Sequence, residues 1–335
     1  MIHRRMIGLL IRLLIRPLAC AAIALSIIPQ AHAQPFPNKP ITIIVPFGAG
    51  GPTDIVARVI AERLTATLGQ RVIVENAAGA AGITGAARAA RSAPDGYTLL
   101  MGPMSTMSFS PTLYPNAPVH TLKDFEPVGI VASAPIVIVG SKNIPGDTLK
   151  EFVASLKKNA KLSNGNAGVG TTSHLACLLL NSRFGVDPAV VPYKSSGAAV
   201  ADMLTGTIDY VCDQSTSVMG QVSAGAIKPL AVLAPSPSPA LPGVPTIAQA
   251  GYPGAEMVVW NALFAPKGTP REIITQINEA IGKGITDPTA LERFQKLGAE
   301  PPPAADRSPE ALAKIHAADV EKWGKVIRDA KVQVQ

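Results

Sequence analysis

Two long apolar runs constrain the fold of this chain more than any other feature. Residues 125–141 read FEPVGIVASAPIVIVGS, and residues 256–266 read EMVVWNALFAP. The first run is too long and too uniformly apolar for one ordinary strand. We interpret both runs as segments that cross between two lobes and act as a hinge. Lobe 1 would then consist of residues 34–131 plus 257–335, and lobe 2 of residues 132–256, with a cleft between them.

Strand and helix patterns alternate within each expected lobe. Apolar runs predict strands at 41–45, 71–76 and 97–101 in lobe 1, and at 161–166, 190–193, 208–212 and 228–234 in lobe 2. Amphipathic segments between them predict helices, one of which opens with the capping box Thr148-x-x-Glu151. Three helices, at 270–283, 288–297 and 309–330, would close the chain. The fold class is therefore α/β, with a mainly parallel sheet flanked by helices in each lobe.

The first 33 residues have the pattern of a signal peptide. Four arginines precede the apolar stretch 18–28, and Ala31-His32-Ala33 is a small-x-small cleavage signal. The sequence predicts export with cleavage after Ala33, and the adjacent Arg4 and Arg5 leave open the Sec and the twin-arginine routes. Without this leader the net charge falls from +7 to +3, since 26 Lys and Arg face 23 Asp and Glu. No basic run remains, so nucleic acid is not an expected partner.

Two cysteines, Cys177 and Cys212, remain in the expected mature chain. An even pair of cysteines in an oxidising compartment predicts a disulfide. The spacing His174-x-x-Cys177 looks like half of a metal site, but no second histidine lies nearby in the sequence. We therefore favour the disulfide and expect no metal.

The segment 46–54, PFGAGGPTD, links a predicted strand to a predicted helix. Its glycines allow backbone N–H groups to form a concavity at a helix N-terminus, which suits a small anion. It is not the dinucleotide fingerprint, because the third glycine of G-x-G-x-x-G would fall at Thr53, and no Gly-Lys-Ser/Thr follows as in a P-loop. A tight turn without a ligand is the alternative.

Loops after the other predicted strands have the same character. They are rich in Gly, Ser and Thr and mostly precede helices: 102–110, 167–173, 194–197 and 213–217. Ligands of open parallel sheets lie beyond the carboxyl ends of the strands, so these loops would surround one site. Donor groups without an activated nucleophile favour binding over catalysis, although each Ser or Thr could instead only cap its helix.

A secreted serine hydrolase is the alternative function. Ser155-x-x-Lys158 has the spacing of a serine-enzyme motif but lacks the partner motifs. His174 lies next to Ser173 without an acid partner, and Asp54 with Asp213 would be the carboxylate pair of a hydrolase. We expect none of these groups to be catalytic, and we predict that the protein is not an enzyme and has no cofactor.

Several motifs occur in order along nearly the whole mature chain: PFGAGGPTD (46–54), PDGYTLL (94–100), GVGTTSHL (168–175), VPYKSSG (191–197), IDYVCDQSTS (208–217), LPGVPTIAQAGYPG (241–254) and WNALFAPKGTP (260–270). With these motifs the chain resembles the Bug family, the extracytoplasmic solute receptors associated with tripartite tricarboxylate transport. One departure is Gly48-Ala49, where many members have two prolines.

The resemblance implies a periplasmic-binding-protein-like fold of the Venus-flytrap type that holds a carboxylate, in part through ordered water. It also implies a location in the periplasm, no catalysis, and membrane transporter subunits or a sensor as partners. We expect a monomer. Dicarboxylates, amino acids and aromatic acids all stay open as ligands.

The expected ligand-binding residues come from the loops that follow the strands. They are Phe47, Ala49, Gly50, Gly51, Thr53, Asp54, Ser105, Thr106, Gly170, Thr171, Thr172, Ser173, Tyr193, Ser195 and Asp213. Phe47, Tyr193 and Met104 would form an apolar side. Asp213 would repel a carboxylate unless it orients Tyr193, binds an ammonium group of the ligand or receives a water.

Overall fold

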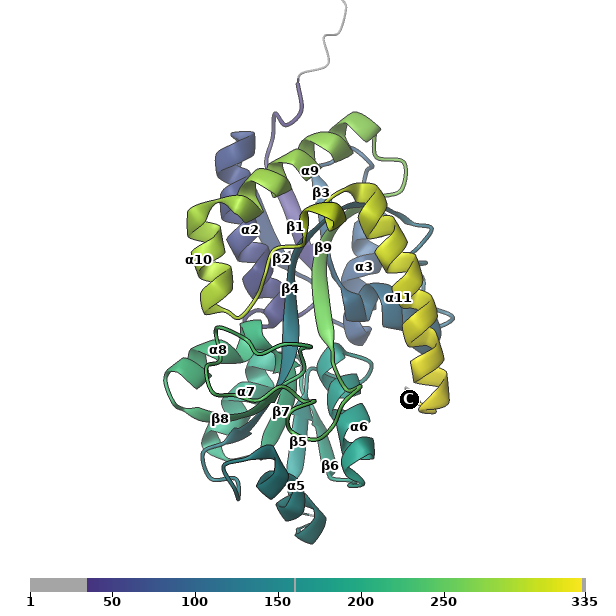
Figure 1. Cartoon of the computed structure of the whole chain (residues 1–335). Coiled ribbons are helices and arrows are strands. Elements are labelled where there is room, and N and C mark those ends of the chain that lie inside the picture. The colour runs from purple at the N-terminus through teal and green to yellow at the C-terminus, as the bar shows by residue number, and fades with distance from the viewer. Residues whose placement is uncertain (1–34, 160, 333–335) are drawn as a thin grey trace, which may run out of the picture. The chain divides into compact units, whose positions relative to one another are not determined.

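The computed structural model describes residues 35–159 and 161–332. The predicted signal peptide therefore lies outside the described residues. Residues 39–335 form one compact unit, separate from residues 1–38, and the fold described below is that of this unit (Figure 1). None of the helices described is long and apolar enough to cross a membrane.

Nine strands form one sheet with the order β2-β1-β3-β9-β4-β7-β5-β6, and β8 pairs with β4. Their bounds are β1 (Ile41–Val45), β2 (Val72–Asn76), β3 (Thr98–Pro103), β4 (Phe125–Ser141), β5 (Ser163–Asn166), β6 (Ala189–Pro192), β7 (Tyr210–Gln214), β8 (Ile227–Val232) and β9 (Val258–Pro266). We use lobe 1 for the elements around β1–β3 and lobe 2 for those around β5–β8.

The two apolar runs form the long strands β4 and β9, which pair antiparallel with each other. The first half of β4 pairs with β9, and its second half pairs with β7 and β8. β4 thus belongs to both lobes, and it is apolar over most of its length because it is buried in each. The prediction that this run crosses between the lobes is confirmed, whereas the lobe boundaries at 131/132 and 256/257 stay predictions.

Each lobe has a parallel set of three strands, as the alternating pattern predicts. β1 pairs in parallel with β2 and β3, and β5 pairs in parallel with β6 and β7. The crossing strands add antiparallel pairs, so the complete sheet is mixed. The carboxyl ends of the parallel strands are where the five loops expected to bind a ligand begin.

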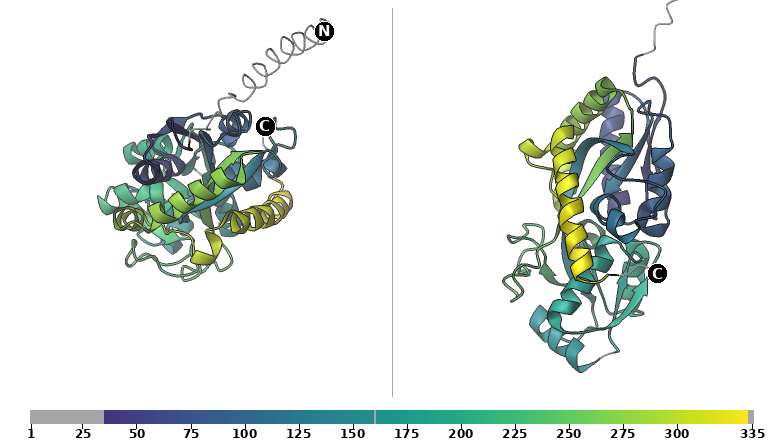
Figure 2. Two further views of the ribbon diagram at one scale, coloured as in Figure 1. Left: turned by 90° about the horizontal axis from the view of Figure 1, so that it is seen from above. Right: turned by 90° about the vertical axis from the view of Figure 1, so that its right-hand side faces the viewer.

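Helices cover both lobes (Figures 1 and 2). Those of lobe 1 are α2 (Pro52–Leu68), α3 (Ile83–Ala90), α4 (Ser110–Leu113), α9 (Arg271–Thr286), α10 (Pro288–Lys296) and α11 (Pro309–Asp329), and those of lobe 2 are α5 (Leu149–Lys158), α6 (Thr172–Phe184), α7 (Ser196–Thr205) and α8 (Ser215–Ser223). The predicted capping box at Thr148 and Glu151 is confirmed at the start of α5. Seen from the side, α11 runs from lobe 1 to the flank of lobe 2, where it lines a groove together with α6 (Figure 2, right).

Two helical segments lie where only loops are expected from the sequence. A 3-10 turn, η1, covers Ala80–Gly82, and a π-helix, η2, covers Ser105–Phe109 and continues into α4. The segment 102–110 has no charged first turn and no amphipathic period, and η2 is held in place by burial of every one of its residues. Burial rather than local propensity therefore determines this helix.

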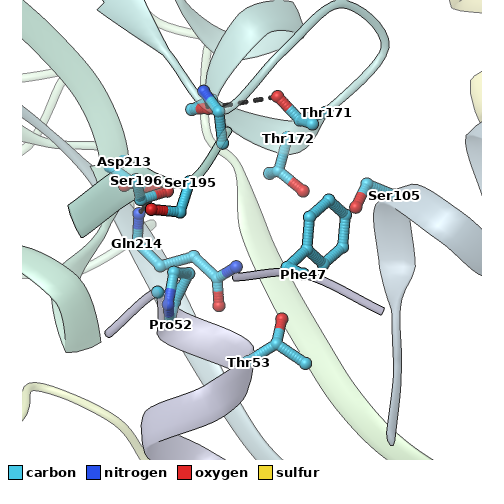
Figure 3. Close-up of a pocket in the computed structure, with 13 residues that line it drawn as sticks. Phe47, Pro52, Thr53, Ser105, Thr171, Thr172, Ser195, Ser196, Asp213 and Gln214 are labelled. Carbon is cyan, nitrogen blue, oxygen red and sulfur yellow. Dashed lines mark hydrogen bonds between the residues drawn. The ribbon is translucent and has the colours of Figure 1, made fainter. Parts of the chain in front are cut away.

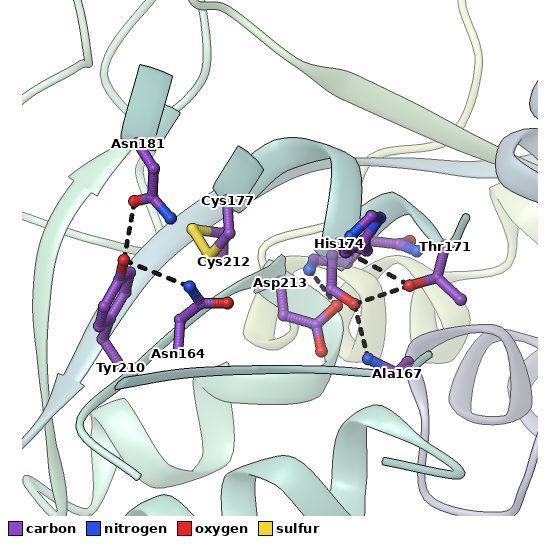
Figure 4. The surroundings of a disulfide bond; sticks show 11 residues. Asn164, Ala167, Thr171, His174, Cys177, Asn181, Tyr210, Cys212 and Asp213 are labelled. Carbon is purple, nitrogen blue, oxygen red and sulfur yellow. Dashed lines mark hydrogen bonds between the residues drawn. A yellow bond between two sulfur atoms is a disulfide. The ribbon is translucent and has the colours of Figure 1, made fainter. Parts of the chain in front are cut away.

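Cys177 on α6 and Cys212 on β7 form a disulfide, with 5.3 Å between their Cα atoms (Figure 4). Both cysteines are fully buried. The predicted disulfide is confirmed, and it joins the helix and the strand that each carry an expected site loop at one end.

Candidate functional site

A pocket of about 350 Å³ lies where the loops after the parallel strands meet (Figure 3). Both lobes contribute to its lining, which consists of Phe47, Gly51, Pro52, Thr53, Ser105, Ala167, Thr171, Thr172, Ser173, Ser195, Ser196, Asp213 and Gln214. These residues follow β1, β3, β5 and β6 in the chain or, as Asp213 and Gln214 do, end β7. Loops at the carboxyl ends of parallel strands were expected to lie together although they are far apart in the sequence. The sheet topology brings them together around this pocket.

Four helix N-termini point their first turns toward this pocket. α2 begins at Pro52, α6 at Thr172, α7 at Ser196 and α8 at Ser215, each next to or within the lining. Aligned peptide dipoles place partial positive charge at each of these ends. These four ends favour an anion in the pocket, although none of its described lining residues is Lys, Arg or His.

The four helices differ in how their first turns are capped. Thr171 accepts a hydrogen bond from the N–H of His174, and Ser195 accepts one from the N–H of Ala198. These hydroxyls cap their own helices, which was the expected alternative to binding a ligand. The N-caps of α2 and α8 are Gly51 and Gln214. In the described structure neither of these two residues has a side chain that accepts a hydrogen bond from the first turn of its helix. Those backbone N–H groups are free of capping side chains and suit a bound anion.

Asp54 shapes the glycine loop from outside the pocket. Its carboxylate accepts hydrogen bonds from Arg58, from Asn76 and from the backbone N–H of Gly50. Burial raises the pKa of Asp54, but the hydrogen bonds from Arg58, Gly50 and Asn76 outweigh it and hold that pKa below its ordinary value. Asp54 is thus the ionised partner of an i,i+4 ion pair.

Six of the expected ligand-binding residues do not line the pocket: Ala49, Gly50, Asp54, Thr106, Gly170 and Tyr193. Ala49 and Gly50 are exposed, and the N–H of Gly50 donates to Asp54. Thr106 donates to the carbonyl of Ala81, and the N–H of Gly170 donates to Nδ1 of His174. The polar groups of Gly50, Thr106 and Gly170 thus have partners inside the protein instead of facing the pocket.

Tyr193 is not oriented by Asp213. Its hydroxyl donates to Asp202 at 2.8 Å, and burial together with this bond raises the pKa of Tyr193 to about 12. Met104 is buried in the apolar core, so of the three residues expected to form an apolar side only Phe47 faces the pocket. The ring of Phe47 lies near the side chains of Ser105 and Thr172 (Figure 3).

Asp213 and Gln214 lie side by side at the end of β7, and both are 3% exposed. Asp213 accepts hydrogen bonds from the backbone N–H of Gln214 at 2.8 Å and from the hydroxyl of Ser196. Burial raises the pKa of Asp213 to about 6 although these hydrogen bonds lower it. The pocket thus contains one carboxyl group whose protonation changes near neutral pH.

Gln214 lines the pocket although it was not among the residues expected from the sequence. Its Oε1 accepts a hydrogen bond from Nδ2 of Asn261 on β9, at 3.0 Å. With the carbonyl end fixed in this way, the amide nitrogen points into the pocket, toward Phe47 (Figure 3). Pro52, Ala167 and Ser196 also line the pocket and were not expected individually. Pro52, Ser196 and Gln214 are direct sequence neighbours of expected residues, and Ala167 lies in the expected loop 167–173.

The groups considered for catalysis do not meet. Ser155 lies on α5, where its hydroxyl donates to the carbonyl of Glu151, and it is not part of the pocket lining. Burial lowers the pKa of His174, whose Nδ1 accepts the N–H of Gly170. Asp54 is held by Arg58 and does not line the pocket with Asp213. Among the residues that the structure describes, no three His, Cys, Asp or Glu side chains are grouped so that they could hold a metal ion.

Residues 56–332 match the family described as the tripartite tricarboxylate transporter family receptor. A protein of Agrobacterium vitis, known as the UPF0065 protein in the TAR-I ttuE-ttuC' intergenic region, is 41% identical over 90% of this chain and 87% of its own length. The solved structure of the periplasmic binding protein BugD is 38% identical with a TM-score of 0.86, over 90% of this chain and 100% of that one. MatC from Rhodopseudomonas palustris with bound malate is 36% identical with a TM-score of 0.83, over 87% and 100%.

Proposed function

Because this chain belongs to the tripartite tricarboxylate transporter receptor family, we propose that it is a periplasmic receptor that binds a small organic carboxylate and delivers it to a transporter or a sensor. The resemblance to the Bug family is confirmed, and the fold is that of a periplasmic binding protein. The family and its solved members are solute-binding proteins. The ligand class and the delivery are the proposal.

The observation that carries the proposal is a pocket that favours an anion without a cationic side chain. Gly51 and Gln214 leave the first turns of α2 and α8 without a side-chain cap, and the amide nitrogen of Gln214 adds a donor. Backbone N–H groups at helix N-termini bind carboxylates well. The absence of lysine or arginine in the described lining fits a site in which the anion is exchanged rather than held by a strong ion pair.

The lining of the pocket supports a small ligand that is partly apolar. Phe47, Pro52 and Ala167 add apolar surface to a lining that also contains the donor groups. A ligand with one or two carboxylates and a short carbon skeleton matches both surfaces. MatC, a relative with bound malate, supports this class.

Thermal unfolding with a panel of carboxylates tests the proposal. Malate, succinate, adipate, aspartate and benzoate would be compared with their neutral amides. A ligand at one hundred times its Kd stabilises the folded state by about 2.7 kcal/mol through mass action, and the amides should do much less.

Position 51 offers a matched pair of variants. A Cβ added at Gly51 would lie 3.5 Å from the carbonyl oxygen of Gly48, which is an ordinary contact. Gly51→Ala should therefore fold and still respond to the ligand. Gly51→Asp places a carboxylate at the N-cap of α2, where it caps the free N–H groups itself, so it should raise the melting temperature without ligand and abolish the ligand response.

Failure of every carboxylate to stabilise the protein, together with hydrolytic turnover that is lost in Ser155→Ala, would support the secreted serine hydrolase instead. Ser155→Ala should leave the thermal response to carboxylates unchanged, because Ser155 does not line the pocket.

A further inference from the structure

Asp213 lies in a pocket that otherwise contains no charged side chain. Of the thirteen described lining residues, Asp213 is the single one that titrates. Its polar neighbours are the hydroxyls of Ser196 and Ser217 and the backbone N–H of Gln214, and Ser196 and Gln214 are seen beside it in Figure 3. A carboxylate bound in the same pocket would be a second negative charge close to the first.

No group on the elements packed against β7 neutralises Asp213. The paired segments of β4 and β5, and the whole of α8, contain no charged residue. On the other elements near the pocket, two carboxylates already have partners: Asp202 on α7 accepts from Tyr193, and Asp54 on α2 pairs with Arg58. His174 on α6 is neutral because burial lowers its pKa. Lys194, which precedes α7, is exposed.

We propose that Asp213 meets the ligand as a neutral carboxylic acid, so that the site takes up one proton with each carboxylate anion that it binds. This inference rests on the proposed function. The proton comes from solvent and binds one oxygen of Asp213, and the resulting O–H donates a hydrogen bond to an oxygen of the ligand carboxylate. Two carboxylates that share a buried site hold one proton between them for the same electrostatic reason.

The rest of the lining favours this arrangement over a salt bridge with a ligand ammonium group. An ammonium group needs several acceptors, yet the carbonyl oxygen of Gln214 is occupied by Asn261, and the hydroxyls of Thr171 and Ser195 accept from their own helices. The donors at the first turns of α2 and α8 have no side-chain cap and suit a carboxylate instead. Asp213 therefore selects simple carboxylates over zwitterionic amino acids.

Titration calorimetry at pH 6 and pH 8 tests this inference, with malate, succinate, adipate and aspartate as the probes. If only protein with a neutral Asp213 binds and its pKa is about 6, Kd should be about 50-fold larger at pH 8 than at pH 6. In buffers of different ionisation enthalpy, the uptake at pH 8 should approach one proton per ligand.

Asp213→Asn provides the matched comparison, because it keeps the shape of the side chain and is neutral at both pH values. It should bind the dicarboxylates at pH 8 about as tightly as the wild type binds them at pH 6, without proton uptake. Any titration of the ligand itself would appear equally in both proteins. Asp202→Asn, on the neighbouring helix but outside the lining, should keep the wild-type pH dependence.

Two results would overturn the inference while leaving the proposed function intact. One is a Kd for the dicarboxylates that is equal at both pH values in the wild type. The other is tight binding of aspartate that Asp213→Asn abolishes, which would show an ionised Asp213 paired with an ammonium group. If no carboxylate binds at either pH, the proposed function itself fails.

Discussion

At position 214 one side-chain amide orients another. Asn261 on β9 donates to Oε1 of Gln214, which turns the Gln214 amide nitrogen into the pocket. Oδ1 of Asn261 is buried and has no partner within the described part of the chain. A buried polar atom without a partner costs free energy, so this pair is maintained at a cost that a role in binding would explain.

Gln214→Glu should weaken carboxylate binding strongly. Glutamate keeps an oxygen for Asn261 but replaces the donor by a negative charge. A hydrogen bond to a charged group contributes about 1.5–3 kcal/mol, so Kd should rise at least about tenfold. Gln221→Glu, the same change on α8 outside the pocket lining, is the control and should bind as the wild type does. Calorimetry at pH 6 would measure both variants, and an unchanged Kd in Gln214→Glu would remove Gln214 from the site.

The carboxyl of Asp213 should also affect stability without any ligand. Its pKa is raised to about 6 in the folded protein, from an ordinary value of 3.8. The folded state then holds a proton that the unfolded state releases, so stability is lost as pH rises from about 4 to 6. At pH 7.5 the free energy of unfolding of Asp213→Asn, measured in urea, should exceed that of the wild type by roughly 2–3 kcal/mol. At pH 4 this advantage should nearly vanish, and an equal advantage at both pH values would contradict the raised pKa.

Residue types in the sequence indicated which loops form the site but not which way each side chain faces. Asp54 and Asp213 both follow strands, and both were expected at the ligand. Arg58 lies four residues after Asp54 on α2 and turns its carboxylate away from the pocket, whereas no such partner follows Asp213. The i,i+4 spacing of Asp54 and Arg58 was visible in the sequence and indicates an ion pair. The bond between Gln214 and Asn261 joins residues 47 apart, and no local pattern predicts it.

Among the elements, the ends of the helices and the crossing strands followed the sequence most closely. Asp287 caps α10 and Thr148 caps α5, because a short polar side chain before an amphipathic run satisfies free N–H groups. The π-helix η2 could not be predicted, since its conformation depends on contacts with α11 and α4 that lie outside its own segment.

The disulfide should contribute a large part of the stability of lobe 2. It closes a segment with a sequence separation of 35, for which the chain-entropy model gives roughly 3–4 kcal/mol. The double variant Cys177→Ala, Cys212→Ala should therefore have a lower free energy of unfolding by about this amount in urea. Treatment with a reductant should destabilise the wild type and leave the variant unchanged. Equal stability of the oxidised wild type and the variant would contradict the prediction.

The two lobes touch around the pocket at several points. The hydroxyl of Tyr114 in lobe 1 donates to the carbonyl of Val169 in lobe 2 at 3.1 Å. Ser215 donates to the carbonyl of Gly298 at 2.8 Å. A Cβ added at Gly197 would lie 3.2 Å from the carbonyl oxygen of Gly50. Backbone groups of both lobes thus approach closely along the rim.

We expect these contacts to hold the lobes in a closed arrangement, with β4 and β9 as the hinge about which the lobes would open. Tyr114→Phe removes one hydrogen bond, worth about 1 kcal/mol, so it should shift the protein toward a more open form and weaken ligand binding about fivefold. Small-angle scattering of the ligand-free variant should give a larger radius of gyration than the wild type. Tyr252→Phe, on lobe 2 away from the rim, is the control. Identical scattering and Kd in both variants would show that the Tyr114 contact does not influence closure.

The buried lining of the pocket has a kinetic consequence. Most of the polar side chains around the pocket are buried, and contacts between the lobes lie beside it. We expect a solute to enter the pocket mainly while the lobes are apart. At high solute concentration the observed association rate should then level off at the rate of lobe separation. The residence time of the bound solute would also depend on the rate at which the lobes separate. A membrane partner that holds the lobes apart would thereby decide when the solute leaves, without competing for any of the groups that bind it.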